Sequence, residues 1–287
     1  MKQFSFWDEN NRGRLERFHY VGAHGAEKYA LIYLPWGYND HPERRYDILY
    51  LIHGGGGNPD SWTDSCPIKN MLDRSIAAGE AKPMIVVFPT FYSAPPQHDP
   101  KNVDGNHERS CVLDFQTEEI KQFLLPAVEG AYRSYAEGTD LDSLRRARDH
   151  RAFGGFSMGG VNTWYAFTLH LDCFSVFVPL SGDCWAAGPK GGGDRPAETA
   201  AALRESVRAQ GFGPDDFAIF AATGTEDIAY PNLTPQIEAM KPLDDMFRYS
   251  DDWGQGNLHY LVGEGLAHNS DAVNQYLYNY LPFLFRR

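Results

Sequence analysis

The stretch GGFSMGG, residues 154–160, decides the fold of this chain, because it sets one serine, Ser157, between two pairs of glycines. It ends the short apolar run 151–156 and leads directly into GVNTWYAFTL, which has the composition of an apolar helix. Glycines allow a strand and a helix to approach closely around a sharp turn, since no Cβ atoms collide there. A flexible linker would not lie between a buried strand and an apolar helix. We therefore expect a strand–turn–helix unit that presents the hydroxyl of Ser157.

Short apolar runs recur along the chain, and a loop and a helical pattern follow most of them. The runs are 46–52, 83–89, 151–156, 174–180, 217–223 and 258–262. They do not alternate polar and apolar residues, which indicates strands that are covered on both faces, as in a parallel sheet between two helical layers. Ahead of them, two β-rich segments around AHGA (23–26) predict an antiparallel hairpin. The expected fold class is α/β, a mostly parallel, doubly wound sheet with this N-terminal hairpin, in one domain over residues 1–287.

Composition excludes several classes of protein. The chain has 287 residues, 43% of them hydrophobic, and a net charge of −12, so it offers no basic surface for nucleic acid. No apolar stretch approaches the roughly 20 residues that span a bilayer, and no membrane association is expected. The first residues lack the apolar segment of a signal peptide. Aromatic residues reach 14%, which either lines a pocket for a carbohydrate or aromatic ligand or serves core packing.

No metal site is expected. The cysteines are Cys66, Cys111, Cys173 and Cys184. None forms a CxxC pair, so a structural zinc site is not indicated; one disulfide is possible, and our expected pairing is Cys66 with Cys111 on loops at one rim of the sheet. One loop gathers the polar residues His98, Asp99, Asp104, His107 and Glu108. Their spacing matches no zinc motif, and we expect a solvated polar loop.

The pattern G-x-S-x-G around Ser157, placed between a strand and a helix, is that of a nucleophile elbow. A serine hydroxyl is a poor nucleophile until a base takes its proton, and the base needs an orienting carboxylate. In α/β-hydrolases the acid and then the histidine follow the serine, each after a later strand. The run 217–223 is followed by Glu226 and Asp227. We favour Asp227 as the acid, and Glu226 stays open as the alternative.

Among the ten histidines, His268 alone has the expected order and context, since it follows the last strand and precedes a C-terminal helical segment. His259 lies within that strand and is expected to be packed. His53 precedes a run of glycines and is expected to brace that loop.

An acyl-transfer site also needs N–H donors aimed at the oxyanion. One is the N–H after the nucleophile, which belongs to Met158. The other is expected from LIHGGGGN (51–58), with Gly55 as the first choice and Gly56 as the second. This glycine run lacks both the GK[ST] ending of a P-loop and the spacing of a dinucleotide site.

Several segments in fixed order resemble the feruloyl esterases of carbohydrate esterase family 1, most closely the esterase modules attached to bacterial xylanases. These segments are YDILYLIHGGGGN, AFGGFSMGGVNTWY, PLSGDCW, FAATGTEDIAYPNLTPQIEAM and GEGLAH. The similarity runs from about residue 15 to the C-terminus and covers more motifs than G-x-S-x-G alone.

The resemblance implies an α/β-hydrolase with Ser157 as nucleophile, His268 as base and Asp227 as acid. Enzymes of this family release hydroxycinnamic acids, above all ferulic acid, from arabinose side chains of xylan and need no cofactor. The resemblance also implies that Trp185 borders the acyl pocket, although core packing could equally explain a tryptophan there. It implies a secreted or periplasmic enzyme; without a visible signal peptide, a cytoplasmic one stays open.

Alternatives remain at this point. An acetylxylan esterase or an enzyme similar to S-formylglutathione hydrolase would share the fold, but the aromatic richness and the SGDCW segment argue against so small an acyl group. Acyl transfer to a sugar and an inactive carbohydrate-binding homologue are further alternatives.

Overall fold

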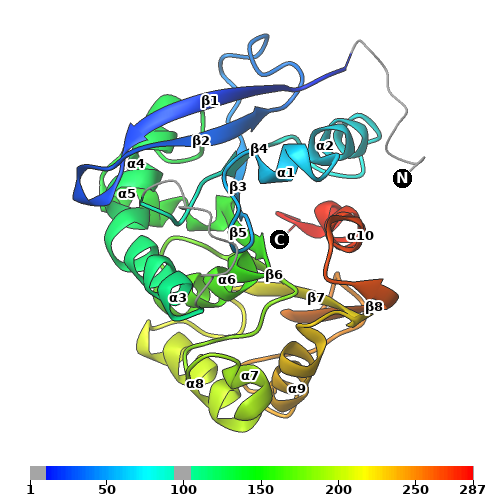
Figure 1. Cartoon of the computed structure of the whole chain (residues 1–287). Helices are drawn as coiled ribbons and strands as arrows, with labels where there is room; N and C mark the ends of the chain where they lie inside the picture. Colours follow the sequence, from blue (N-terminus) through cyan, green and yellow to red (C-terminus); the bar gives the residue numbers. More distant parts are fainter. Residues whose placement is uncertain (1–10, 94–104, 287) are drawn as a thin grey trace.

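One eight-stranded sheet runs through the molecule in the order β1-β2-β4-β3-β5-β6-β7-β8. The computed structural model describes residues 11–93 and 105–286 (Figure 1). The strands are β1 Arg14–Val21, β2 Glu27–Leu34, β3 Asp47–Ile52, β4 Met84–Phe88, β5 Arg151–Phe156, β6 Val176–Leu180, β7 Ala218–Glu226 and β8 Leu258–Ala267.

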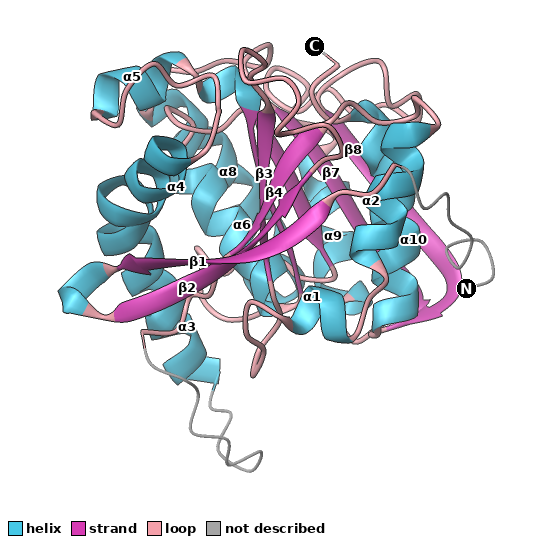
Figure 2. Cartoon of the chain, turned by 90° about the horizontal axis from the view of Figure 1, so that it is seen from above, coloured by secondary structure: helices cyan, strands magenta, loops and turns pink. Residues whose placement is uncertain are grey.

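Helices cover both faces of this sheet, as Figure 2 shows with α4, α6 and α8 on one side and α2 and α10 on the other. The α-helices are α1 Ser61–Asp64, α2 Ile68–Ala77, α3 Gly105–Asp114, α4 Leu125–Ala131, α5 Leu141–Arg146, α6 Met158–Leu169, α7 Gly191–Asp194, α8 Pro196–Ala209, α9 Tyr230–Met240 and α10 Ser270–Tyr280. A π-helical segment, Phe115–Leu124, connects α3 to α4.

The strand directions confirm the predicted fold class. β1 pairs with β2 and β2 with β4 in antiparallel register, which makes the N-terminal hairpin an extension of the sheet. The strands from β4 to β8 pair in parallel. The carboxyl ends of parallel strands lie at one edge of a sheet, which is where ligands bind in folds of this class.

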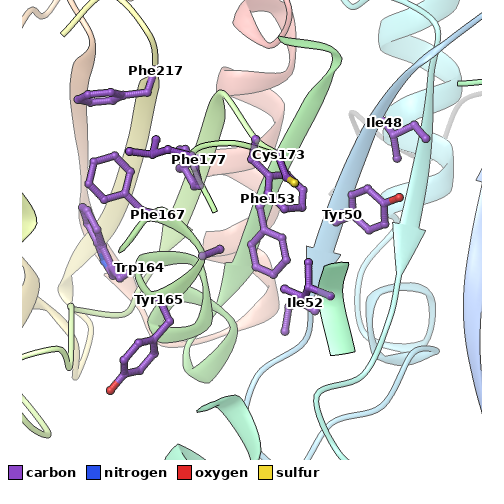
Figure 3. Close-up of a cluster of buried hydrophobic side chains, with 14 of the residues drawn as sticks. Ile48, Tyr50, Ile52, Phe153, Trp164, Tyr165, Phe167, Cys173, Phe177 and Phe217 are labelled. Carbon is purple, nitrogen blue, oxygen red and sulfur yellow. The ribbon is translucent and has the colours of Figure 1, made fainter. Parts of the chain in front are cut away.

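Alternating side chains of the central strands point to opposite faces and build two apolar clusters. On one face Tyr50, Phe153 and Phe177 pack with Trp164 and Phe167 of α6 (Figure 3). The opposite face is covered by α2 and α10. The central strands therefore have no solvated face, as their continuous apolar sequences predicted.

The expected disulfide between Cys66 and Cys111 is wrong, because both are free thiols. Cys66 belongs to the cluster under α2 and α10, whereas Cys111 lies on α3 and packs against the cluster on the opposite face. The sheet separates the two sulfur atoms, so they cannot meet within the short distance that a disulfide requires. Cys173 and Cys184 are free and buried as well.

Among the described residues, no helix is both long and apolar enough to cross a membrane.

Candidate active site

Ser157 occupies the turn between β5 and α6 with φ of 59° and ψ of −118°, a conformation that side-chain-bearing residues rarely adopt. Its N–H donates to the carbonyl of Leu180 at the end of β6, and its own carbonyl accepts from the N–H of Val161, each at 3.0 Å. Strained residues persist only where the surrounding structure holds them. These two hydrogen bonds hold the turn from the strand side and the helix side, as the elbow prediction requires.

The glycines around Ser157 are required by close backbone contacts. A Cβ atom on Gly155 would lie 2.6 Å from the backbone of Gly159, and one on Gly159 would lie 2.4 Å from the carbonyl oxygen of Ile52. No real Cβ atom tolerates such distances, so β3, β5 and α6 can meet only where side chains are missing. The absence of side chains next to the serine therefore allows α6 to start directly at the end of β5.

His268 joins Ser157 to Asp227 through two hydrogen bonds. Its Nε2 lies 2.9 Å from Ser157 Oγ, and its Nδ1 lies 2.7 Å from Asp227 Oδ1. In the tautomer with a proton on Nδ1, the ring donates to the carboxylate and accepts from the serine hydroxyl. Glu226, the alternative acid, is exposed at the end of β7. Of the two candidate acids, Asp227 is therefore the one that contacts the imidazole.

Three strand ends create this arrangement. Ser157 follows β5, Asp227 follows β7 and His268 follows β8, all at the same edge of the parallel sheet. A register shift between β7 and β8 at Gly224 and Glu226 precedes the acid. Such bulges re-aim the side chains that follow them. Residues that are far apart in the sequence thereby form one hydrogen-bonded series.

The Asp227 carboxylate is held ionised. Its side chain is 0% exposed, compared with 20% for His268. Burial is the largest influence and raises the pKa of Asp227, but hydrogen bonds from His268 and from the Ala229 N–H outweigh it, so that the pKa lies below its ordinary value. The ionised carboxylate accepts the hydrogen bond from Nδ1 and thereby fixes the orientation of the imidazole ring.

The glycine loop after β3 lies against the serine. A Cβ atom on Gly54 would be 3.3 Å from the Cβ atom of Ser157. His53 braces this loop, with Nδ1 2.7 Å from the Gly54 carbonyl and Nε2 2.8 Å from the Thr90 hydroxyl. Burial lowers the pKa of His53 to about 4, so its ring is neutral at neutral pH. The structural role predicted for His53 is confirmed.

Two backbone N–H groups, one on the residue after the serine and one on the glycine loop, are available as donors. Met158 begins α6, so its N–H has no acceptor within the helix. The N–H of Gly55 forms no hydrogen bond with another described residue. The N–H of Gly56 donates to the Tyr92 hydroxyl at 2.9 Å and is therefore engaged. Gly55 stays the better candidate of the two glycines.

Glu108, expected from the sequence to lie in a solvated loop, instead supports this glycine loop. Glu108 is only 6% exposed, and the Tyr92 hydroxyl donates to its Oε1 at 2.7 Å. A Cβ atom on Gly55 would lie 2.5 Å from the same carboxylate oxygen. The expectation of a solvated Glu108 is wrong. Glu108 stands four and seven residues before the buried Val112 and Phe115, a spacing that places all three on one face of a helix. This spacing could have predicted that Glu108 is buried.

Of the other polar residues of that loop, the structure describes only His107. His107 is exposed on α3, whereas His98, Asp99 and Asp104 lie outside the described residues. Within residues 11–93 and 105–286, no cluster of three or more His, Cys, Asp or Glu side chains could hold a metal ion.

Trp185 lies in the loop after β6 and is half-buried. Its indole N–H donates to Asp183 at 3.1 Å, and its carbonyl accepts from the Tyr165 hydroxyl at 2.9 Å. The ring therefore has a fixed orientation next to the core.

His259 is 1% exposed and stacks on Phe220, which confirms that it is packed.

The site has the parts of a serine hydrolase: a strained serine, an imidazole within hydrogen-bonding distance, a buried carboxylate behind it, and two N–H groups beside the serine. This combination activates a hydroxyl for attack on a carbonyl carbon. The fold and the site together define the class of α/β-hydrolases.

Comparisons with known proteins identify the family. The model of the esterase family matches residues 23–241. Endo-1,4-beta-xylanase Y of Acetivibrio thermocellus is 39% identical over 274 residues, which is 95% of this chain and 23% of that protein. An endo-1,4-beta-xylanase/feruloyl esterase of Xylanibacter ruminicola is 26% identical over 63% of this chain and 21% of that protein. This chain therefore spans about a quarter of the length of these relatives.

Among solved structures, a serine-to-alanine variant of the feruloyl esterase module from Clostridium thermocellum, in complex with sinapinate, superposes with a TM-score of 0.84. It is 36% identical, and the match covers 100% of this chain and 92% of that one. This chain belongs to the esterase family, and it is a serine esterase with the α/β-hydrolase fold.

Proposed function

We propose that this chain hydrolyses the esters that join hydroxycinnamic acids, ferulic acid above all, to arabinose side chains of xylan. The observation that carries the proposal is the series Ser157–His268–Asp227 in a chain similar over almost its whole length to a feruloyl esterase module. Sinapinate, the ligand of that module, is itself a hydroxycinnamate, which supports an acyl group of this kind.

In the proposed first half-reaction, His268 Nε2 takes the proton of Ser157 as the hydroxyl oxygen attacks the ester carbonyl. Asp227 stabilises the imidazolium that forms. The ring then gives this proton to the sugar oxygen as the carbon–oxygen bond of the ester breaks. The products are a free sugar hydroxyl and an acyl group on Ser157.

In the second half-reaction, His268 takes a proton from a water molecule, and the resulting hydroxide attacks the acyl-enzyme carbonyl. Return of the proton to the Ser157 oxygen releases the hydroxycinnamate and restores the enzyme. In both steps the N–H groups of Met158 and Gly55 stabilise the negative oxygen of the tetrahedral intermediate. We assign Trp185 as a wall for the aromatic ring of the acyl group; the hydrogen bond from its indole N–H to Asp183 holds the ring in place.

A substrate series tests the proposal. We expect kcat/KM for methyl ferulate to exceed that for p-nitrophenyl acetate once both are corrected for the reactivity of their leaving groups. A corrected preference for acetate would instead favour an acetylxylan esterase or an S-formylglutathione hydrolase-like enzyme. Methyl caffeate, p-coumarate and sinapate then rank the hydroxycinnamates.

We further propose that the enzyme acts outside the cytoplasm, because xylan is a polymer of the plant cell wall. The relationship to xylanases supports this location. Esterase activity that remains with the cytosolic fraction of the native cells would contradict it.

A further inference from the structure

A cavity of about 290 Å³ lies beside the serine, between the glycine loop, α1 and the start of α10. Gly54, which lines it, approaches the Cβ of Ser157, and Phe156, which also lines it, immediately precedes that serine. The Phe156 ring lies 4.5 Å from the imidazole of His268, centroid to centroid. The cavity therefore adjoins the histidine side of the reacting pair.

Its place in the fold separates it from the wall assigned to the acyl group. Trp62 and Val273 of the cavity belong to the apolar cluster under α2 and α10. Trp185 packs against the cluster on the opposite face of the sheet. An ester bound at Ser157 extends in two directions, and the oxygen that receives the proton from His268 must lie on the histidine side. The cavity is thus next to the alcohol part of the ester.

The lining of the cavity suits a sugar. Ser61, Ser65 and Ser270 contribute hydroxyl groups, and Trp62 and Phe156 contribute aromatic side chains. Trp62 is 3% exposed, and its indole N–H has no acceptor among the described residues. The volume is close to the lower end of small-molecule sites, roughly 300 Å³, which suits one monosaccharide ring.

We propose that this cavity binds the leaving sugar, the single pentose ring that carries the ester. The inference rests on the proposed function, because it assigns the alcohol side of the same reaction. A methyl ester leaves the cavity empty, whereas a feruloylated arabinose fills it. The cavity thereby favours sugar esters over simple alkyl esters.

Two single variants test this inference. Ser270→Leu on α10 and Ser65→Leu after α1 each place a larger side chain in the cavity, from different sides. For each variant, kcat/KM is measured with 5-O-feruloyl arabinose and with methyl ferulate. We expect the ratio of the two values to fall by about tenfold or more, the scale at which added methylenes exclude a ligand. Using a ratio cancels any general damage to the catalytic groups. Ser206→Leu on α8, half-buried like Ser270 but outside the cavity, is the matched control and should keep the wild-type ratio.

An unchanged ratio in both cavity variants would overturn the inference, and so would a ratio that rises because methyl ferulate is the substrate excluded. The latter result would place the aromatic acyl group in this cavity. The wild-type enzyme tests the proposed function separately in the same assay, since failure to hydrolyse either feruloyl ester would refute that function whatever the variants do.

Discussion

Each end of the sheet carries a histidine–aspartate pair beside a cavity. At the carboxyl ends of the strands, His268 Nδ1 lies 2.7 Å from Asp227. At the opposite end, His150 Nδ1 lies 2.6 Å from Asp47, in a larger cavity of about 560 Å³. By pair distance and cavity volume alone, the second end would be the better candidate for an active site.

The surroundings of the two pairs differ. The Asp227 side chain is fully buried, and its pKa is lowered by the hydrogen bonds it accepts. For Asp47, burial raises the pKa more than its contact with His150 lowers it. The His150 ring is 41% exposed and stacks on Tyr135 at 3.6 Å between centroids. In the described part of the chain, no hydroxyl group hydrogen-bonds to that ring.

The comparison shows that a histidine–aspartate pair becomes a candidate catalytic site only where a third group, the serine hydroxyl, contacts the histidine. His268 faces a serine held in a strained turn between the start of α6 and the glycine loop, whereas no described hydroxyl group faces His150 in this way. Cavity volume is a weaker guide, because the larger cavity lies at the end of the sheet where no described hydroxyl group hydrogen-bonds to the histidine.

The largest expected effect is that of Ser157→Ala. Without the hydroxyl no acyl-enzyme forms, and kcat for methyl ferulate should fall on the order of 10⁶-fold, as when the nucleophile of a serine hydrolase is removed. Steady-state kinetics on purified protein measure this, with circular dichroism as the check on folding. A variant that keeps the wild-type rate would refute the role of Ser157.

Replacing the carboxylates sharpens the comparison between the two ends. Asp227→Asn should lower kcat about 10⁴-fold, because an amide no longer holds the imidazole in the productive tautomer. Asp47→Asn, a matched change at the other end, should leave kcat unaltered and should not lower Tm, because a charge that burial disfavours is removed. Glu226→Gln tests the adjacent alternative acid and should also leave kcat unaltered.

If Glu226→Gln were the damaging change and Asp227→Asn the harmless one, the acid would be assigned to the wrong neighbour. If Asp47→Asn abolished activity in a folded protein, the pair at the opposite end of the sheet would be required for catalysis, which would contradict the comparison.

A smaller effect is expected from Tyr92→Phe, which removes the hydroxyl between the Gly56 N–H and Glu108. The glycine loop should then shift relative to Ser157, and kcat should fall on the order of tenfold. This loss is smaller than the 10²–10³-fold loss in kcat when an oxyanion donor is removed outright. Tyr132→Phe, which breaks a similar contact to Glu16 far from the site, is the control. Equal rates for the two variants would contradict a positioning role for Tyr92.

The smallest effect concerns stability and pH. Burial lowers the pKa of both His53 and His170 to about 4, while the unfolded chain binds these protons near pH 6.5. The unfolded state therefore binds more protons between about pH 6.5 and 4, so stability should fall as the pH falls through this range. Thermal unfolding of wild type and His170→Gln at several pH values checks this. The variant should lose less stability on acidification, and an equal loss would contradict the argument.

Much of this site was accessible from sequence because its signals are local. The turn around Ser157 is fixed by neighbouring glycines, and His268 is identified by its place after the last strand. The choice between Asp227 and Glu226 could not be made from the local sequence. The two adjacent carboxylates differ only in which one faces a histidine that follows another strand.

The errors have the same physical origin. The pairing of Cys66 with Cys111 failed because loop position does not reveal which face of the sheet a side chain covers. Glu108 was placed in solvent although it lies against the glycine loop, because its partner Tyr92 comes from a different part of the chain.

The most direct test of the central claim is covalent trapping of the nucleophile. The protein is treated with a fluorophosphonate, digested, and its labelled peptides are identified by mass spectrometry. We predict one stoichiometric label on Ser157, lost in Ser157→Ala and strongly slowed in Asp227→Asn but unaffected in Asp47→Asn. A label on any other residue, or none on active enzyme, would contradict the assignment of Ser157 as the group that His268 activates.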